Sequence, residues 1–158
     1  MRTESGRGEP RTTGHTDRLI LVYDGDSGVR AMLADVLKKL VGREECALCE
    51  ITYSPVGKRR AWAACERRLG LIVDEIHRDQ IPRAWRISRT QLPCVLGRSG
   101  EEMPFVLLTR DEIVVCQASV ERLERRIGEK LGAARSGGVL PAVGDALQPQ
   151  NSSERRRT

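Results

Sequence analysis

A short apolar strand, a tight polar turn and an amphipathic helix follow one another directly and constrain the fold of this chain most strongly. Residues 19–23 (LILVY) predict a buried strand, which the turn Asp24-Gly25-Asp26-Ser27-Gly28 ends. Ser27 suits the N-cap of the helix that follows, and Gly42 suits its left-handed C-terminal position. Six apolar residues with spacings of three and four give that helix one apolar face: Val29, Met32, Leu33, Val36, Leu37 and Leu40. A unit of this kind is typical of α/β proteins.

Composition places one domain between two polar tails. The chain has 158 residues, enough for one core. Residues 1–17 and 133–158 lack apolar periodicity and predict disordered tails, which leaves a domain at residues 18–132. Of the net charge of +5, residues 1–18 carry +1 and residues 133–158 carry +2, so the remainder carries +2. That small charge argues against nucleic acid as a partner.

Cysteine usage and hydropathy predict the compartment. Five cysteines occur without an export signal, which favours a cytoplasmic protein with reduced thiols. No segment approaches the roughly 20 apolar residues of a membrane span, so no membrane association is expected.

The order of predicted elements specifies a thioredoxin-like α/β fold. Its central mixed sheet has about four strands flanked by helices, and a CxxC segment with an extra helix is inserted after the first helix. Pro93 lies at the start of the third strand, where thioredoxin-like folds usually carry a cis-proline, so a cis peptide bond is expected there. Capping-box spacing at Thr109–Glu112 predicts one helical turn, and Ser119 suits an N-cap. After the first helix, the predicted elements are an irregular link at 43–55, helices at 57–69, 80–87 and 119–131, and strands at 71–76, 92–96 and 105–109.

Two family resemblances involve these motifs. The segment Tyr23-Asp24-Gly25-Asp26-Ser27-Gly28 resembles the start of the DCC family of thiol-disulfide oxidoreductases, whose motif is YDGDCxxC. Ser27 and Arg30 stand where that family has its two cysteines. Together with Cys46-Ala47-Leu48-Cys49, Ile51-Thr52-Tyr53, Gly57 and Trp62, the chain is similar to an uncharacterised bacterial family with YxADSG and CxLCxLTYGxxG motifs. These resemblances imply a thioredoxin-like fold, but the redox pair of the first family is missing at Ser27 and Arg30, and the second family brings no established activity.

Cys46 and Cys49 form the sharpest chemical motif. A pair with this spacing can close a disulfide, chelate one metal ion such as zinc, or remain two reduced thiols. In a redox protein the Cys46 thiol would attack a substrate disulfide to form a mixed disulfide. Cys49 would then resolve this mixed disulfide by attacking the Cys46 sulfur. The pair follows a helix about 21 Å long at about 1.5 Å per residue, so we expect it far from the Asp24 turn unless the link doubles back. Negative charge raises a thiol pKa, and three glutamates flank the pair: Glu44, Glu45 and Glu50.

A metal site would need further ligands, because structural zinc takes four. The candidates are Cys65, Cys94, Cys116 and His77. Cys65 shares an apolar helix face with Trp62, and Cys94 alternates with apolar residues along its strand, so both are expected to pack in the core.

The polar turn offers a second candidate site. Asp24 and Asp26, with Ser27, could hold Mg²⁺ or a substrate beside the helix start, or could simply shape and cap the turn. A receiver-like phosphoacceptor is a third hypothesis, in which Asp74 would take the phosphoryl group. The sequence supplies no lysine between Thr109 and the final helix for that chemistry.

Two basic segments are further candidates for a functional site. Residues 53–58, followed by Arg59 and Arg60, could cradle an anion or form a plain turn. Arg83, Arg86 and Arg89 predict an exposed face. The leading hypothesis is thiol-disulfide chemistry at Cys46 and Cys49 with a protein or small-molecule partner. The alternatives are a non-enzymatic metal-binding or partner-binding module and the receiver-like phosphoacceptor.

Overall fold

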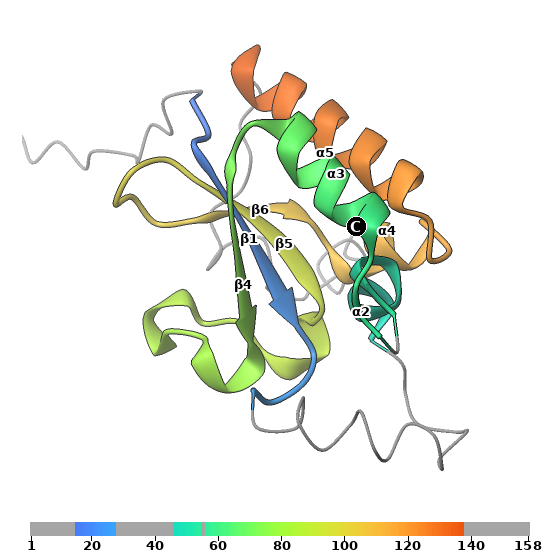
Figure 1. The fold of residues 1–158 in the computed structure, drawn as a ribbon. Coiled ribbons are helices and arrows are strands. Elements are labelled where there is room, and N and C mark those ends of the chain that lie inside the picture. Colours follow the sequence, from blue (N-terminus) through green and yellow to red (C-terminus); the bar gives the residue numbers. More distant parts are fainter. Residues whose placement is uncertain (1–14, 28–45, 55, 138–158) are drawn as a thin grey trace, which may run out of the picture.

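β1 (Arg18–Tyr23) is an inner strand of a four-stranded sheet with the order β4-β1-β5-β6 (Figure 1). The computed structural model describes residues 15–27, 46–54 and 56–137, so the helix predicted over residues 28–41 lies outside the described residues. β1 runs parallel to β4 (Ile72–His77) and antiparallel to β5 (Cys94–Arg98), which is antiparallel to β6 (Phe105–Leu108). The mixed sheet with these strand directions confirms the predicted thioredoxin-like α/β fold class.

The alternation of side chains along β1 divides the core into two layers. Leu19, Leu21 and Tyr23 face the layer that the helices cover, whereas Ile20 and Val22 face the opposite layer. All five are at most 3% exposed, which explains why this strand is apolar on both faces.

Helices cover the first layer. α2 (Ala47–Thr52), α3 (Arg60–Leu69), α4 (Arg110–Val114) and α5 (Val120–Arg135) lie on the same side of the sheet, with α3 beside α5 (Figure 1). Their apolar side chains pack with β1, β5 and β6 in one cluster. The predicted inward face of the last helix is confirmed by its buried residues, which include Val120, Leu123, Ile127 and Leu131.

Three 3₁₀ turns between β4 and β5 cover the second layer: η1 (Arg78–Gln80), η2 (Arg83–Trp85) and η3 (Arg89–Gln91). Ile81, Trp85 and Ile87 from this connection pack against the second face of the sheet. The helix predicted over residues 80–87 is therefore wrong. Arg86 adopts a left-handed φ of 52°, which interrupts a helix in the middle of this segment.

The insertion after β1 also differs from its prediction. Residues 47–52 form α2 instead of an irregular link, because Leu48 and Ile51 are one helical turn apart and both enter the core. β2 (Tyr53–Ser54) pairs with β3 (Gly57–Lys58), so the helix predicted from residue 57 begins at Arg60. Gly57 has a φ of 125°, which a helix does not allow.

Several local predictions are confirmed. The Leu92–Pro93 peptide bond is cis, the Thr109 capping box is formed, and the Ser119 side chain caps α5. α5 continues to Arg135, three residues beyond the boundary expected from composition.

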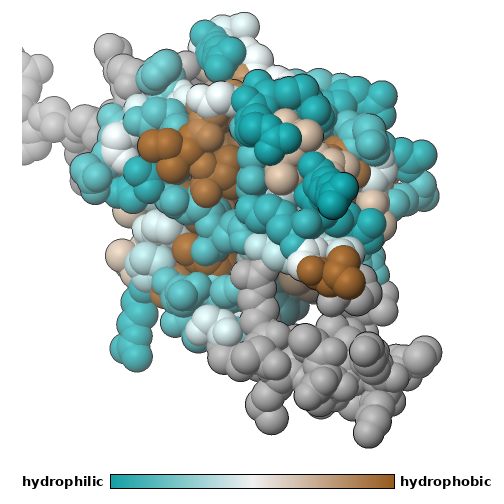
Figure 2. Space-filling model, viewed as in Figure 1, coloured by the Kyte–Doolittle hydropathy of each residue, from teal (hydrophilic) through white to brown (hydrophobic). Residues whose placement is uncertain are grey.

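Hydrophilic side chains predominate on the face shown in Figure 2, where the apolar ones form separate groups. Within the described ranges, no helix is both long enough and apolar enough to cross a membrane.

Candidate thiol site

Cys46 lies at the N-cap of α2 with an extended backbone, and Cys49 lies one turn later. Both thiols are partly buried, and neither forms a disulfide. The fully buried side chains of Leu48, Ile51 and Thr52 fix α2 on the core, so the position of the thiol pair is set by packing.

Hydrogen bonds to the Cys46 sulfur stabilise its thiolate form. The largest contribution comes from the Cys49 side chain, and the backbone amides of Asp24, Cys49 and Leu48 add to it. Burial acts in the opposite direction, but together these contacts lower the pKa of Cys46 from its ordinary value of 9.0 to about 7. Of the three glutamates expected to raise this pKa, Glu44 and Glu45 lie outside the described residues, so that expectation stays a prediction.

The thiol pair lies beside the turn that follows β1, although the sequence predicted a large separation. The backbone amide of Asp24, the residue that follows β1, contacts the Cys46 sulfur. The expected separation of the pair from this turn is therefore wrong.

A polar and aromatic wall adjoins the site. The Tyr23 hydroxyl lies 3.0 Å from Thr52 Oγ1, which donates its own proton to the Leu48 carbonyl. Tyr23 is therefore the donor in this pair. Its ring stands edge-on to Tyr53 with the centroids 6.1 Å apart, and lies 5.5 Å from His77 at a tilt of 30°. Burial raises the pKa of Tyr23, so its hydroxyl stays neutral.

The acidic turn is held by an arginine that the sequence interpretation did not identify. Arg78 donates to Asp26 through Nε (3.1 Å) and Nη2 (2.9 Å), and its Nη1 lies 3.4 Å from Asp24 Oδ1. The Ser27 backbone amide and hydroxyl both donate to Asp79. Asp24 and Asp26 thus serve as partners of Arg78, which weakens the hypothesis that they hold Mg²⁺.

The sequence contains one signal that would have predicted this ion pair. Arg78 directly follows β4, and β4 runs parallel to β1 with Tyr23 opposite His77. Residues that follow neighbouring parallel strands meet at the same edge of a sheet.

The geometry does not support Asp74 as a phosphoacceptor. Asp74 is the third residue of β4 and lies opposite Ile20, well before the turn. Its carboxylate pairs instead with Arg18 Nη1 at 2.6 Å.

The other cysteines are core residues, as expected for Cys65 and Cys94. Cys65 and Cys116 belong to the layer under the helices, and Cys94 belongs to the layer on the opposite face. Burial raises the pKa of all three thiols. Among residues 15–27, 46–54 and 56–137, no three His, Cys, Asp or Glu side chains are grouped to bind a metal ion.

The basic loop is a plain hairpin. Lys58 pairs with Glu66 at 2.9 Å and with Glu75 at 2.7 Å. Arg59 Nε donates to the carbonyls of Glu50 and Tyr53, both at 3.0 Å. These cations support the local structure, which agrees with the plain-turn interpretation of this segment.

The fold and site define a thioredoxin-like α/β protein with an adjacent thiol pair at the carboxyl-terminal edge of its parallel strands. Family models, curated proteins and solved structures gave no match to the chain.

Proposed function

We propose that the protein carries out thiol-disulfide exchange, with Cys46 as the attacking thiol and Cys49 as the resolving thiol. The observation that carries this proposal is the set of hydrogen bonds that lowers the pKa of Cys46 to about 7. Only the thiolate attacks a disulfide, and an attacking thiol works best when its pKa is near the ambient pH.

The exchange proceeds in two balanced steps. The Cys46 thiolate attacks one sulfur of a substrate disulfide, forms a mixed disulfide and releases the other sulfur as a thiolate that takes a proton. Cys49 then loses its proton and attacks the Cys46 sulfur, which closes the Cys46–Cys49 disulfide and releases the second substrate thiol. The substrate gains two electrons and two protons, and the protein dithiol loses both. An external dithiol reductant returns the protein to its starting state.

The surrounding residues have distinct roles in this scheme. The Asp24, Leu48 and Cys49 amides stabilise the Cys46 thiolate, and the Cys49 thiol donates to the sulfur that it later attacks. Because Leu48 and Ile51 anchor α2 in the core, the helical turn that carries Cys49 is held in place.

Metal analysis and thiol titration of the native protein and of cysteine variants test the proposal. The anaerobically purified protein is analysed for zinc and iron, and its thiols are titrated before and after oxidation with a small disulfide. We expect a metal-free protein that loses two thiols, regains them with a dithiol reductant, and yields a peptide cross-linked between Cys46 and Cys49. Cys49→Ser is expected to stop at the mixed disulfide on Cys46.

Cys116→Ser provides the matched control. Cys116 is buried, and its thiol donates to the Glu112 carbonyl at 3.3 Å, a bond that a serine hydroxyl can replace. This variant should retain the reversible loss of two thiols. Stoichiometric metal that disappears in Cys46→Ser/Cys49→Ser would overturn the proposal in favour of a ligand role. Five thiols that persist through oxidation would overturn it as well.

A further inference from the structure

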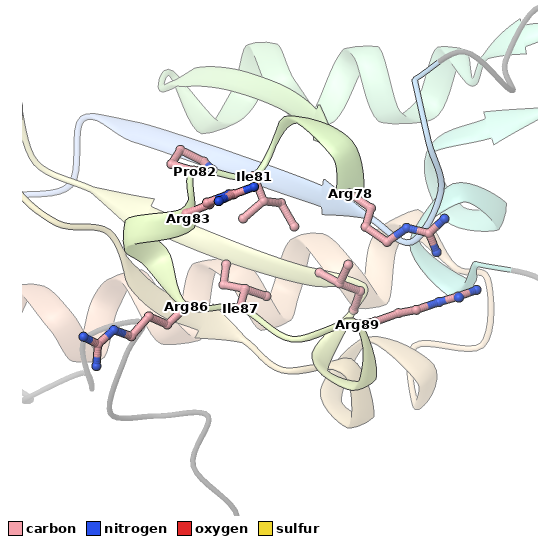
Figure 3. Close-up of a pocket in the computed structure, with 8 residues that line it drawn as sticks. Arg78, Ile81, Pro82, Arg83, Arg86, Ile87 and Arg89 are labelled. Carbon is pink, nitrogen blue, oxygen red and sulfur yellow. The ribbon is translucent and has the colours of Figure 1, made fainter.

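A pocket of about 290 Å³ is lined entirely by the connection between β4 and β5 that contains the 3₁₀ turns (Figure 3). Its lining combines cationic and aliphatic side chains in one short stretch of chain. The volume is close to the lower limit for small-molecule sites. The lining residues are Arg78, Ile81, Pro82, Arg83, Arg86, Ile87, Arg89 and Leu92.

The positive charge of this arginine pocket is largely uncompensated. Arg78 is neutralised by Asp24 and Asp26, but within the described part of the chain Arg83, Arg86 and Arg89 have no carboxylate within ion-pairing distance. Residues 80–100 contain no Asp or Glu, so the connection carries no acid of its own. Guanidinium groups recognise carboxylates through paired N–H donors, which makes an anion the matching ligand.

The aliphatic lining narrows the choice of anion. Ile81 and Ile87 are partly buried, and Leu92 is fully buried beneath them. This aliphatic surface favours a ligand with an apolar portion, because contact removes the apolar surfaces of both the pocket and the ligand from water. A short aliphatic carboxylate therefore fits the pocket better than a bare inorganic ion.

The pocket and the thiol pair adjoin the same turn. Arg78 lines the pocket and bonds Asp24, and the amide of Asp24 bonds the Cys46 sulfur. In Figure 3, Arg78 and Arg89 extend toward the carboxyl-terminal end of β1, whereas Arg86 extends the other way. An anion held by Arg89 would thus lie toward the end of the sheet where the thiols are.

We infer that the arginine pocket selects small disulfides that carry aliphatic carboxylates as the substrates of Cys46. This inference rests on the proposed thiol-disulfide exchange and assigns its substrate class. The carboxylate of one half of the disulfide binds the arginines, while the Cys46 thiolate attacks and the other half leaves as a thiol.

Rates of mixed-disulfide formation with three disulfides test the selection. The probes are dithiodipropionate (anionic), hydroxyethyl disulfide (neutral) and cystamine (cationic). Because leaving-group pKa also changes exchange rates, each rate is divided by the rate of the same probe with a neutral model thiol. At low salt we expect the anionic probe to react about tenfold faster than the neutral one after this correction, with the advantage falling as salt increases.

Exposed arginines supply the variants. Arg83→Gln/Arg86→Gln/Arg89→Gln should abolish the anionic advantage without slowing the neutral probe. Arg135→Gln, at the far end of α5, removes an equivalent charge away from the pocket and should leave the advantage intact. A cationic probe that is fastest, or an anionic advantage that survives in the triple variant, would overturn the inference. Either result would attribute the difference in rate between the probes to the acidic turn or to the overall charge of the protein.

A binding measurement separates failure of the pocket from failure of the thiol chemistry. Calorimetric titration of Cys46→Ser/Cys49→Ser with adipate, a dicarboxylate without sulfur, should give saturable binding that the triple arginine substitution removes. Absence of adipate binding overturns the pocket assignment even if Cys46 exchanges with every probe. Adipate binding in a protein whose Cys46 reacts with no disulfide overturns the substrate assignment and the proposed function, and leaves an anion site.

Discussion

Replacement of Cys49 by alanine removes the largest contribution to the lowered pKa of Cys46. At pH 7 a thiol with a pKa of about 7 is half ionised, whereas one at the ordinary 9.0 is about one per cent ionised. Each thiolate also becomes more nucleophilic as its pKa rises, by roughly eightfold over this interval for a Brønsted coefficient of about 0.45. The two effects oppose each other, so complete loss of the shift slows Cys46 about sixfold at pH 7.

The backbone amides of Asp24, Leu48 and Cys49 remain in the variant, so part of the shift is retained. We therefore expect alkylation of Cys46 by iodoacetamide to slow by between about twofold and sixfold at pH 7. Above about pH 8 the order reverses, because the native thiol is then almost fully ionised, whereas the ionised fraction of the variant thiol still rises and its thiolate is the stronger nucleophile. This crossing of the two pH–rate profiles is the diagnostic result.

Mass spectrometry of the peptide that contains residue 46 follows the alkylation from pH 5 to pH 10. Cys116→Ser is the control, and its profile should match that of the native protein, with a midpoint near pH 7. A native midpoint at pH 8.5 or above would refute the lowered pKa. A Cys49→Ala profile that coincides with the native one would refute the role of the Cys49 thiol.

Three further predictions concern stability. Gly97→Ala places a Cβ in steric conflict with the Phe105 ring, so urea unfolding should show a loss of about 1–3 kcal/mol, and the added substitution Phe105→Leu should recover part of it. Tyr23→Phe removes a buried hydroxyl donor and should cost about 1 kcal/mol in the same assay, whereas an unchanged midpoint would contradict the bond. Burial opposes ionisation of Glu112, but hydrogen bonds that include one from Lys130 lower its pKa below 4.5. The ionised Glu112 side chain therefore stabilises the fold above pH 4.5, and this stabilisation is lost as the pH falls through the lowered pKa. Lys130→Met should therefore lower the Tm more at pH 7 than at pH 3, and equal decreases would contradict this assignment.

Local chemistry predicted much of the fold. The apolar run of β1, the capping box at Thr109 and the cap at Ser119 depend on neighbouring residues alone, and each formed where expected. The order of strands and helices was enough to predict a mixed sheet, because few connections between such elements are allowed.

The errors occurred where distant contacts outweigh local preference. The segment at 80–87 has apolar residues suited to a helix, yet it forms 3₁₀ turns that lay Ile81, Trp85 and Ile87 on the sheet. α2 is only six residues long and would not be stable alone, so its formation depends on the burial of Leu48.

The residues that could do chemistry were evident from the amino-acid sequence: the Cys46–Cys49 pair, the acidic turn and the arginine series. Their combination depends on how the chain folds. It brought the Asp24 amide to the Cys46 sulfur, joined Arg78 to the acidic turn, and gathered four arginines around one pocket. Hydrogen bonds and ion pairs act over a few ångströms, and spacing along the chain does not specify separations of that size.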